Sequence, residues 1–93
     1  MDVPEMPIAT TPYARLSARR LAEDPRDPDA LFVQAAVLAA VGRRPEAIAI
    51  LDELTRVAPD YPGLWRFKAR LYRDLGDERM ERLCLATAQR ETP

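Results

Sequence analysis

The chain has 93 residues, of which 47% are hydrophobic and 31% are charged, and its formal net charge is −1. This length and composition fit one small globular domain with a modest core. The near-neutral charge argues against nucleic acid or an anionic membrane surface as a partner. The single cysteine, the lack of a long apolar run and the lack of a basic, apolar leader predict a cytoplasmic chain without a disulfide or a membrane span.

The N-terminal part of the chain predicts an extended lead followed by a helix. Residues 1–10 contain two prolines and no helical period, so we expect them to be extended. A helix is predicted over 12–24, because Thr11 can cap it and Pro12 suits its first turn. Pro25 follows and ends it.

Two helical hairpins are predicted next, over 28–59 and 62–93. In each, apolar residues recur at spacings of three and four, which is typical of a helix with one buried face. A glycine ends the first helix of each hairpin and a proline ends the second. No stretch alternates with period two, so no strand is expected. The predicted fold class is therefore all-α, with five helices in a single domain over 11–93.

The two hairpins repeat each other at a fixed interval. Pro25, Pro59 and Pro93 follow one another at steps of 34 residues, and Gly42 and Gly76 are separated by the same step. A fixed period in this range indicates that one unit of helical structure is copied and stacked.

The residues at the repeated positions resemble the tetratricopeptide repeat family. That family has a large apolar residue, a small one four positions later, an aromatic one three later, and then glycine. These positions hold Trp65, Ala69, Tyr72 and Gly76 in the second hairpin, and Leu31, Ala35, Leu38 and Gly42 in the first. The resemblance implies antiparallel hairpins stacked as a short right-handed α-solenoid, with the helix over 12–24 as the second half of a truncated repeat.

Leu38 replaces the aromatic residue of the family pattern and Leu54 replaces an alanine. Three polar residues also depart from the pattern. Glu81 stands where the family prefers a small alanine, and Gln34 and Lys68 stand where it has leucine. A carboxylate should not be buried without a partner. We therefore expect the last helix to be tilted, to be frayed, or to pair Glu81 with an arginine.

The resemblance implies a binding function, because members of the family bind protein segments on a concave surface lined by the first helix of each repeat. The three arginines predicted to line this surface, Arg66, Arg70 and Arg73, lie at i, i+4 and i+7 and so share one helix face. With Lys68 added and Asp74 subtracted, the first helix of the second hairpin carries a charge of +3. One hypothesis is that it grips an acidic or C-terminal segment; the other is that the arginines are a solvated face. The predicted lining residues are Phe32, Val33, Ala36, Arg66, Phe67, Arg70 and Arg73.

The last helix suggests an alternative function, a self-associating scaffold or subunit. Terminal units of a stack normally need a polar outer face. Met80, Leu83 and Cys84 are apolar residues that one hairpin is not expected to cover completely. A homodimer through this helix is therefore the second hypothesis, beside docking of a different partner there.

The sequence predicts no catalytic, metal or cofactor site. It has no histidine, which is the commonest general base and metal ligand. Cys84 lies in an apolar run and is expected to be an inert core thiol. No glycine-rich phosphate loop occurs. We therefore predict a non-catalytic adaptor that binds another protein and does not bind nucleic acid.

Overall fold

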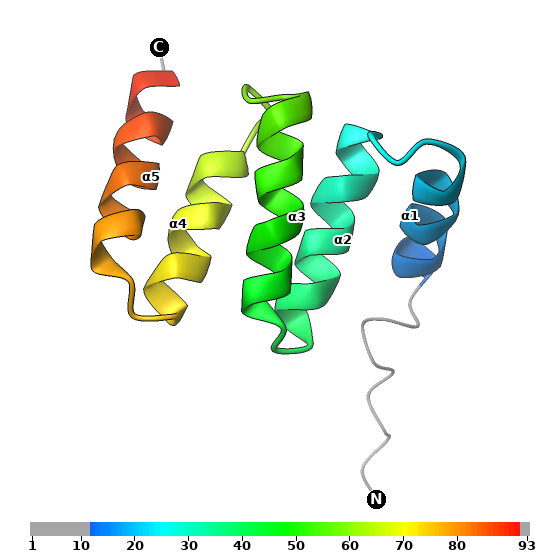
Figure 1. Cartoon of the computed structure of the whole chain (residues 1–93), viewed down its shortest axis with the longest axis horizontal. Coiled ribbons are helices and arrows are strands. Elements are labelled where there is room, and N and C mark those ends of the chain that lie inside the picture. The colour runs from blue at the N-terminus through cyan, green and yellow to red at the C-terminus, as the bar shows by residue number, and fades with distance from the viewer. Residues whose placement is uncertain (1–11, 92–93) are drawn as a thin grey trace, which may run out of the picture.

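The computed structural model describes residues 12–91, and these residues form five α-helices without a strand. The helices stand in a row in chain order, as Figure 1 shows. The predicted all-α fold class is confirmed. The extended lead predicted over 1–10, the Thr11 cap and Pro93 lie outside the described residues. The helices are α1 (Pro12–Glu23), α2 (Pro28–Ala40), α3 (Arg44–Val57), α4 (Leu64–Asp74) and α5 (Glu78–Glu91).

The two predicted hairpins are the pairs α2–α3 and α4–α5, and the helices of each pair make the most extensive contacts in the fold. Gly42 and Gly76 form the tight turns with φ values of +86° and +79°, which only glycine adopts readily. Asp77 caps α5, because its carboxylate accepts a hydrogen bond from the Met80 amide at 3.1 Å. The glycine turns agree with the sequence prediction.

Helix α4 begins at Leu64, although the repeat pattern predicts a start at Pro62. Gly63 has a φ of +81°, and this left-handed conformation separates Pro62 from the helix. The corresponding Pro28 lies in the first turn of α2. There the residue before it, Asp27, has the extended conformation that proline imposes on its predecessor, and it caps the helix.

The core lies where α3 meets α2 and α4. Leu51 and Leu54 of α3 and Leu64 of α4 are fully buried. Ala35 of α2 and Ala47 of α3 are also 0% exposed. Small residues at these positions let the helix backbones approach, and the leucines fill the space beside them. Helix α3 therefore holds the two hairpins together.

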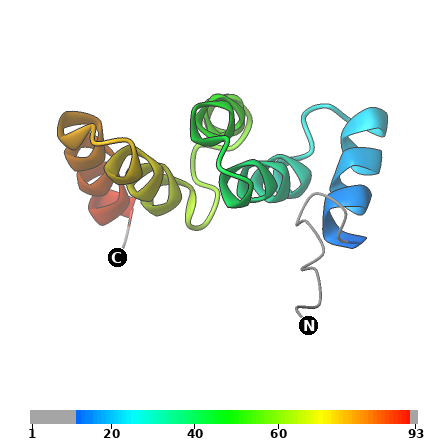
Figure 2. The same cartoon turned by 90° about the horizontal axis from the view of Figure 1, so that it is seen from below.

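Helix α1 lies across α2 rather than alongside it, as the view from below in Figure 2 shows. It turns Ala14 and Ser17 toward α2, and both are buried. Tyr13 and Leu16 share the helical spacing of its apolar residues, yet they are 76% and 52% exposed. Because Ala14 and Ser17 have small side chains, α1 can lie close to α2 there, and Leu21 packs partly buried against the core.

Candidate functional site

A groove of about 290 Å³ lies between α2 and α4. The wall from α2 consists of alanines, of which Ala36 and Ala40 are exposed to solvent. Because these side chains end at Cβ, the groove has room for the backbone of another chain segment. The lining residues are Ala36, Ala39, Ala40, Arg44, Phe67, Arg70, Leu71 and Asp74.

The charges of this α2–α4 groove are only partly neutralised. Nε of Arg44 lies 3.6 Å from a carboxylate oxygen of Asp74, which links the start of α3 to the end of α4. Arg70 is exposed and forms no ion pair with any residue that the structure describes. Its guanidinium is therefore available to a carboxylate from outside the chain.

Phe32 and Phe67, two of the predicted lining residues, pack against each other, and Phe32 also packs against Tyr61. Their ring centroids are 5.5 Å apart, and Phe32 lies 5.0 Å from the ring of Tyr61. Both phenylalanines are half-buried by this cluster, which joins α2, α4 and the loop between the hairpins. Phe67 still lines the α2–α4 groove, whereas Phe32 is used mainly for internal packing. Contacts between the edge of one aromatic ring and the face of another are favourable, so they stabilise this cluster relative to rings exposed to solvent.

The three arginines predicted for one concave surface lie together in a second groove, and only one of them also lines the α2–α4 groove. Only Arg70 lines the α2–α4 groove. Arg66, Arg70 and Arg73 together line a second groove of about 330 Å³ between α4 and α5. All three are exposed. The remaining lining residues of this α4–α5 groove are Ala69, Leu85, Ala88 and Gln89.

Val33 is also separated from the other predicted lining residues. It lines a small cleft of about 130 Å³ between α1 and α2, beside Tyr13, Leu16 and Ser17. This placement follows from the helix period, because Val33 points about 60° away from Ala36 on α2. Of the seven predicted residues, the structure brings three together in the α2–α4 groove: Ala36, Phe67 and Arg70.

The described residues contain no group of three or more side chains that could hold a metal ion. Within the same range, no helix has the length and apolar character needed to cross a membrane. Cys84 is 2% exposed, and burial raises the pKa of its thiol. A buried thiol of raised pKa is a poor nucleophile at neutral pH, in line with the predicted inert core role.

Comparison with known proteins identifies the repeated unit. A family model described as tetratricopeptide repeat matches residues 14–71, which is more than half of the chain. The chain belongs to the tetratricopeptide repeat family. The matched stretch runs from α1 through most of α4, so it includes the helix interpreted above as half of a truncated repeat. No curated protein and no solved structure matches the chain significantly. Tetratricopeptide repeats generally mediate protein–protein interactions.

The two departures from the tetratricopeptide pattern at Gln34 and Lys68 make equivalent contacts. Each lies on the first helix of a repeat and faces the preceding helix. The Ser17 hydroxyl of α1 lies 3.2 Å from Oε1 of Gln34. Nζ of Lys68 lies 2.9 Å from Oδ1 of Asp52 and 3.4 Å from the Thr55 hydroxyl, both on α3. Polar pairs thus replace the family's leucine at both junctions.

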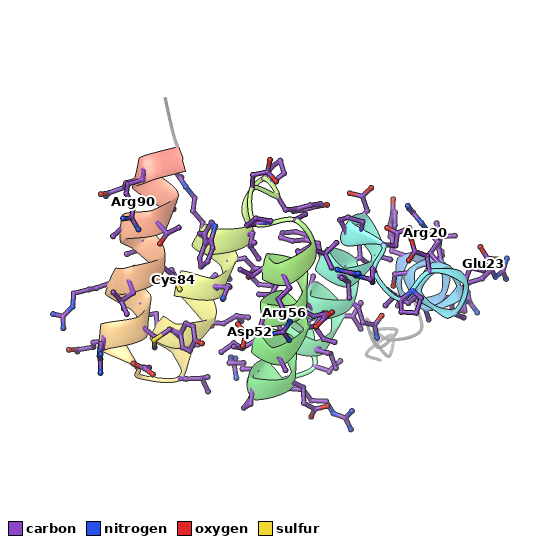
Figure 3. The ribbon with its side chains drawn as sticks, turned by 45° about the horizontal axis from the view of Figure 1, so that its top comes forward. Arg20, Glu23, Asp52, Arg56, Cys84 and Arg90 are labelled. Atoms are coloured by element: carbon purple, nitrogen blue, oxygen red, sulfur yellow. The ribbon has the colours of Figure 1, made fainter. Side chains whose placement is uncertain are left out.

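Lys68 does not add to the charge of the interaction surface. Its side chain is only 7% exposed and lies over the ring of Trp65, with Nζ 4.7 Å from the ring centroid. Figure 3 shows its partner Asp52 on the side of α3 toward α4. The predicted helix charge of +3 therefore overstates the charge of the open face, because Lys68 is neutralised inside the fold.

Glu81 is paired with an arginine, which is one of the three outcomes that the sequence predicts. Its carboxylate accepts a hydrogen bond from Nε of Arg73 at 2.7 Å, and its side chain is 17% exposed. This contact ties the end of α4 to the first turn of α5. It also occupies Arg73, so Arg66 and Arg70 are the two arginines of α4 without an ion pair among the described residues.

The surface predicted for self-association is smaller than expected. Cys84 points between α5 and α4 (Figure 3) and is buried, because it belongs to the contact face of the hairpin. Met80 is half-buried. Only Leu83 is exposed, at 52%, and its neighbours Thr87 and Arg90 are polar. A single leucine among polar residues is less than a dimer interface normally requires.

A polar network around the start of α2 was not predicted from the sequence. The Tyr61 hydroxyl donates a hydrogen bond to Asp29 at 2.7 Å, and Arg20 forms an ion pair with Asp27 at 2.8 Å. Burial, followed by the bond to Asp29, raises the pKa of Tyr61 to about 12. The bond from the Ala30 amide, assisted by Arg20, lowers the pKa of Asp27. No repeat position marks Tyr61, so the sequence carries no signal for this contact.

Proposed function

We propose that this chain is a non-catalytic protein-interaction module that binds a segment of a partner protein in the α2–α4 groove. The observation that carries the proposal is the combination of an alanine wall, a half-buried aromatic ring at Phe67 and an exposed guanidinium at Arg70. The alanines admit the backbone of the segment, and Phe67 provides an apolar contact. Arg70 favours a segment that carries a carboxylate, from an acidic side chain or from a C-terminus.

The experiment compares variants that fill or recharge the groove with variants that make the same changes elsewhere. Ala40→Trp places a large ring in the groove, and Arg70→Glu reverses its unpaired charge. The matched controls are Ala18→Trp and Arg19→Glu, since both residues are exposed on α1. Each protein is used to capture partners from extract of the native cell, and the affinity of the recovered segment is then measured at low and high salt.

We expect Ala40→Trp and Arg70→Glu to lose the partner while both controls retain it. The affinity for wild type should fall as salt is added, because an exposed charge pair is screened. The proposal is wrong if Ala40→Trp and Arg70→Glu bind the recovered segment as tightly as the controls do.

A further inference from the structure

The first hairpin carries a helix on the face that points away from α1. That helix is α4, which follows α3 in the row of Figure 1. Leu51 and Leu54 of α3 are fully buried there, and Leu64 and Leu71 of α4 belong to the same apolar cluster. The repeat unit thus presents an apolar face against which one further helix can pack.

The α4–α5 groove is the corresponding face of the second hairpin. The residues of the first hairpin that α4 covers and the apolar residues that line this groove are 34 positions apart in the chain. No helix in the described part of the chain covers it, because α5 stands at the end of the row in Figure 1. The related positions are Ala35 with Ala69, Leu51 with Leu85, and Leu54 with Ala88.

The rims of the two faces differ in chemistry. On α2 the rim is apolar, and it meets α4 through the contact of Phe32 with Phe67. On α4 the same positions are occupied by arginines. An apolar helix such as α4 that packed against them would remove their guanidinium groups from water without giving them a charged partner. The related positions are Phe32 with Arg66, Ala36 with Arg70, and Ala39 with Arg73.

We propose that the α4–α5 groove binds an amphipathic α-helix of a partner protein that carries carboxylates beside its apolar stripe. The stripe would lie on Leu85 and Ala88, as α4 lies on their counterparts in the first hairpin. The carboxylates would pair with Arg66 and Arg70, while Arg73 is held by Glu81. This surface is separate from the α2–α4 groove, and Arg70 is the only residue that lines both.

Charge decides between such a partner and a second copy of the chain. Two copies related by a twofold axis would place the unpaired Arg66 and Arg70 of one copy against those of the other, which is repulsive. The exposed face of α1 does not suit the groove either, since it presents Arg15 and Arg19. A helix with carboxylates removes the repulsion and gains charge-assisted hydrogen bonds.

The test uses three synthetic helices with acetylated and amidated ends. All carry leucine at i, i+4 and i+7, the spacing of Leu64, Lys68 and Leu71 on α4. The flanking positions are glutamate in the first peptide and lysine in the second, and the third is the glutamate peptide with a central proline. Binding to the full chain is followed by fluorescence anisotropy at low and physiological salt, and amide exchange locates the bound surface.

We expect the glutamate helix to bind, to protect amides around Leu85 and Ala88, and to bind more weakly as salt is added. The lysine and proline peptides should fail. Arg66→Glu should weaken the glutamate helix by about tenfold or more, because a hydrogen bond to a charged group is lost and like charges meet. Arg19→Glu makes the same charge change on α1 and should have no effect.

Ala40→Trp separates this proposal from the function proposed above, since it fills the α2–α4 groove and leaves the α4–α5 groove open. It should leave binding of the glutamate helix unchanged. The proposal is overturned if the glutamate helix does not bind, which would make the arginines a solvated end face. It is equally overturned if Arg66→Glu binds the helix normally, or if sedimentation shows a dimer that Arg66→Glu abolishes.

Discussion

The two hairpins are copies of one unit, yet they differ in what lies against them. Leu51 and Leu85 occupy the same repeat position, and Leu51 is fully buried whereas Leu85 is only half-buried. The difference comes from α4, which covers the first hairpin, and no described helix covers the second. The repeat position specifies the residue type, but the neighbouring helix determines its burial and therefore its contribution to stability.

Truncating the two leucines should give the largest difference between the hairpins. Leu51→Ala removes a side chain that is 0% exposed, so it should destabilise the fold by about 3 kcal/mol. Leu85→Ala should cost about 1 kcal/mol, because part of its surface already faces water. Urea denaturation of both variants measures the difference. Equal losses would mean that α4 adds nothing to the burial of Leu51.

How far the sequence predicts the fold depends on the range of each interaction. Gly42 and Gly76 mark their turns, because a left-handed residue is a local requirement. The pairing of Glu81 is one of the three outcomes that the sequence predicts, since a half-buried carboxylate needs a partner and arginines are abundant nearby. These features depend on a few consecutive residues or on one repeat unit.

The candidate site was harder to predict, because its residues meet across helices. Periodicity places Arg66, Arg70 and Phe67 on the outward side of α4, but it does not show that both arginines line the groove toward α5 and that only Arg70 also lines the groove toward α2. The contact of Phe32 with Tyr61 joins α2 to the loop between the hairpins. Tyr61 lies in a loop, where no period applies, so only the three-dimensional packing reveals it.

The junctions between repeats offer a second comparison, of smaller effect. Lys68 is almost buried and depends on Asp52, whereas the Ser17–Gln34 contact at the first junction is neutral. Asp52→Ala should destabilise the fold by about 2 kcal/mol, because it leaves an ammonium group desolvated with the Thr55 hydroxyl as its remaining polar contact. The half-exposed position of Asp52 keeps the loss below that of a fully buried pair.

Lys68→Met provides the control for this prediction. It keeps the length of the side chain and removes the charge, so its stability should stay within about 1 kcal/mol of wild type. In a protein that already carries Lys68→Met, Asp52→Ala should cause only a small further loss of folding stability. If Asp52→Ala is equally harmful with methionine at position 68, the loss comes from packing of α3 and the ion pair is not its cause.

The loop between the hairpins gives the smallest predicted effect. Tyr61 binds Asp29 and contacts Phe32, but the second hairpin has Gly63 and Arg66 at the positions of those two partners. Tyr61→Phe keeps the ring contact and should cost about 1 kcal/mol for the lost hydrogen bond. Chemical denaturation at neutral pH measures this cost.

The burial of Tyr61, together with the same bond, predicts how stability depends on pH. The pKa of Tyr61 is raised in the folded chain to about 12 from an ordinary value of 10.0, so the folded state holds the proton more tightly. Its contribution is complete below pH 10 and is lost as the pH rises toward 12, because the unfolded chain ionises first. Tyr61→Phe should lack this part of the alkaline loss. An identical alkaline profile in both proteins would show that folding does not raise the pKa of Tyr61.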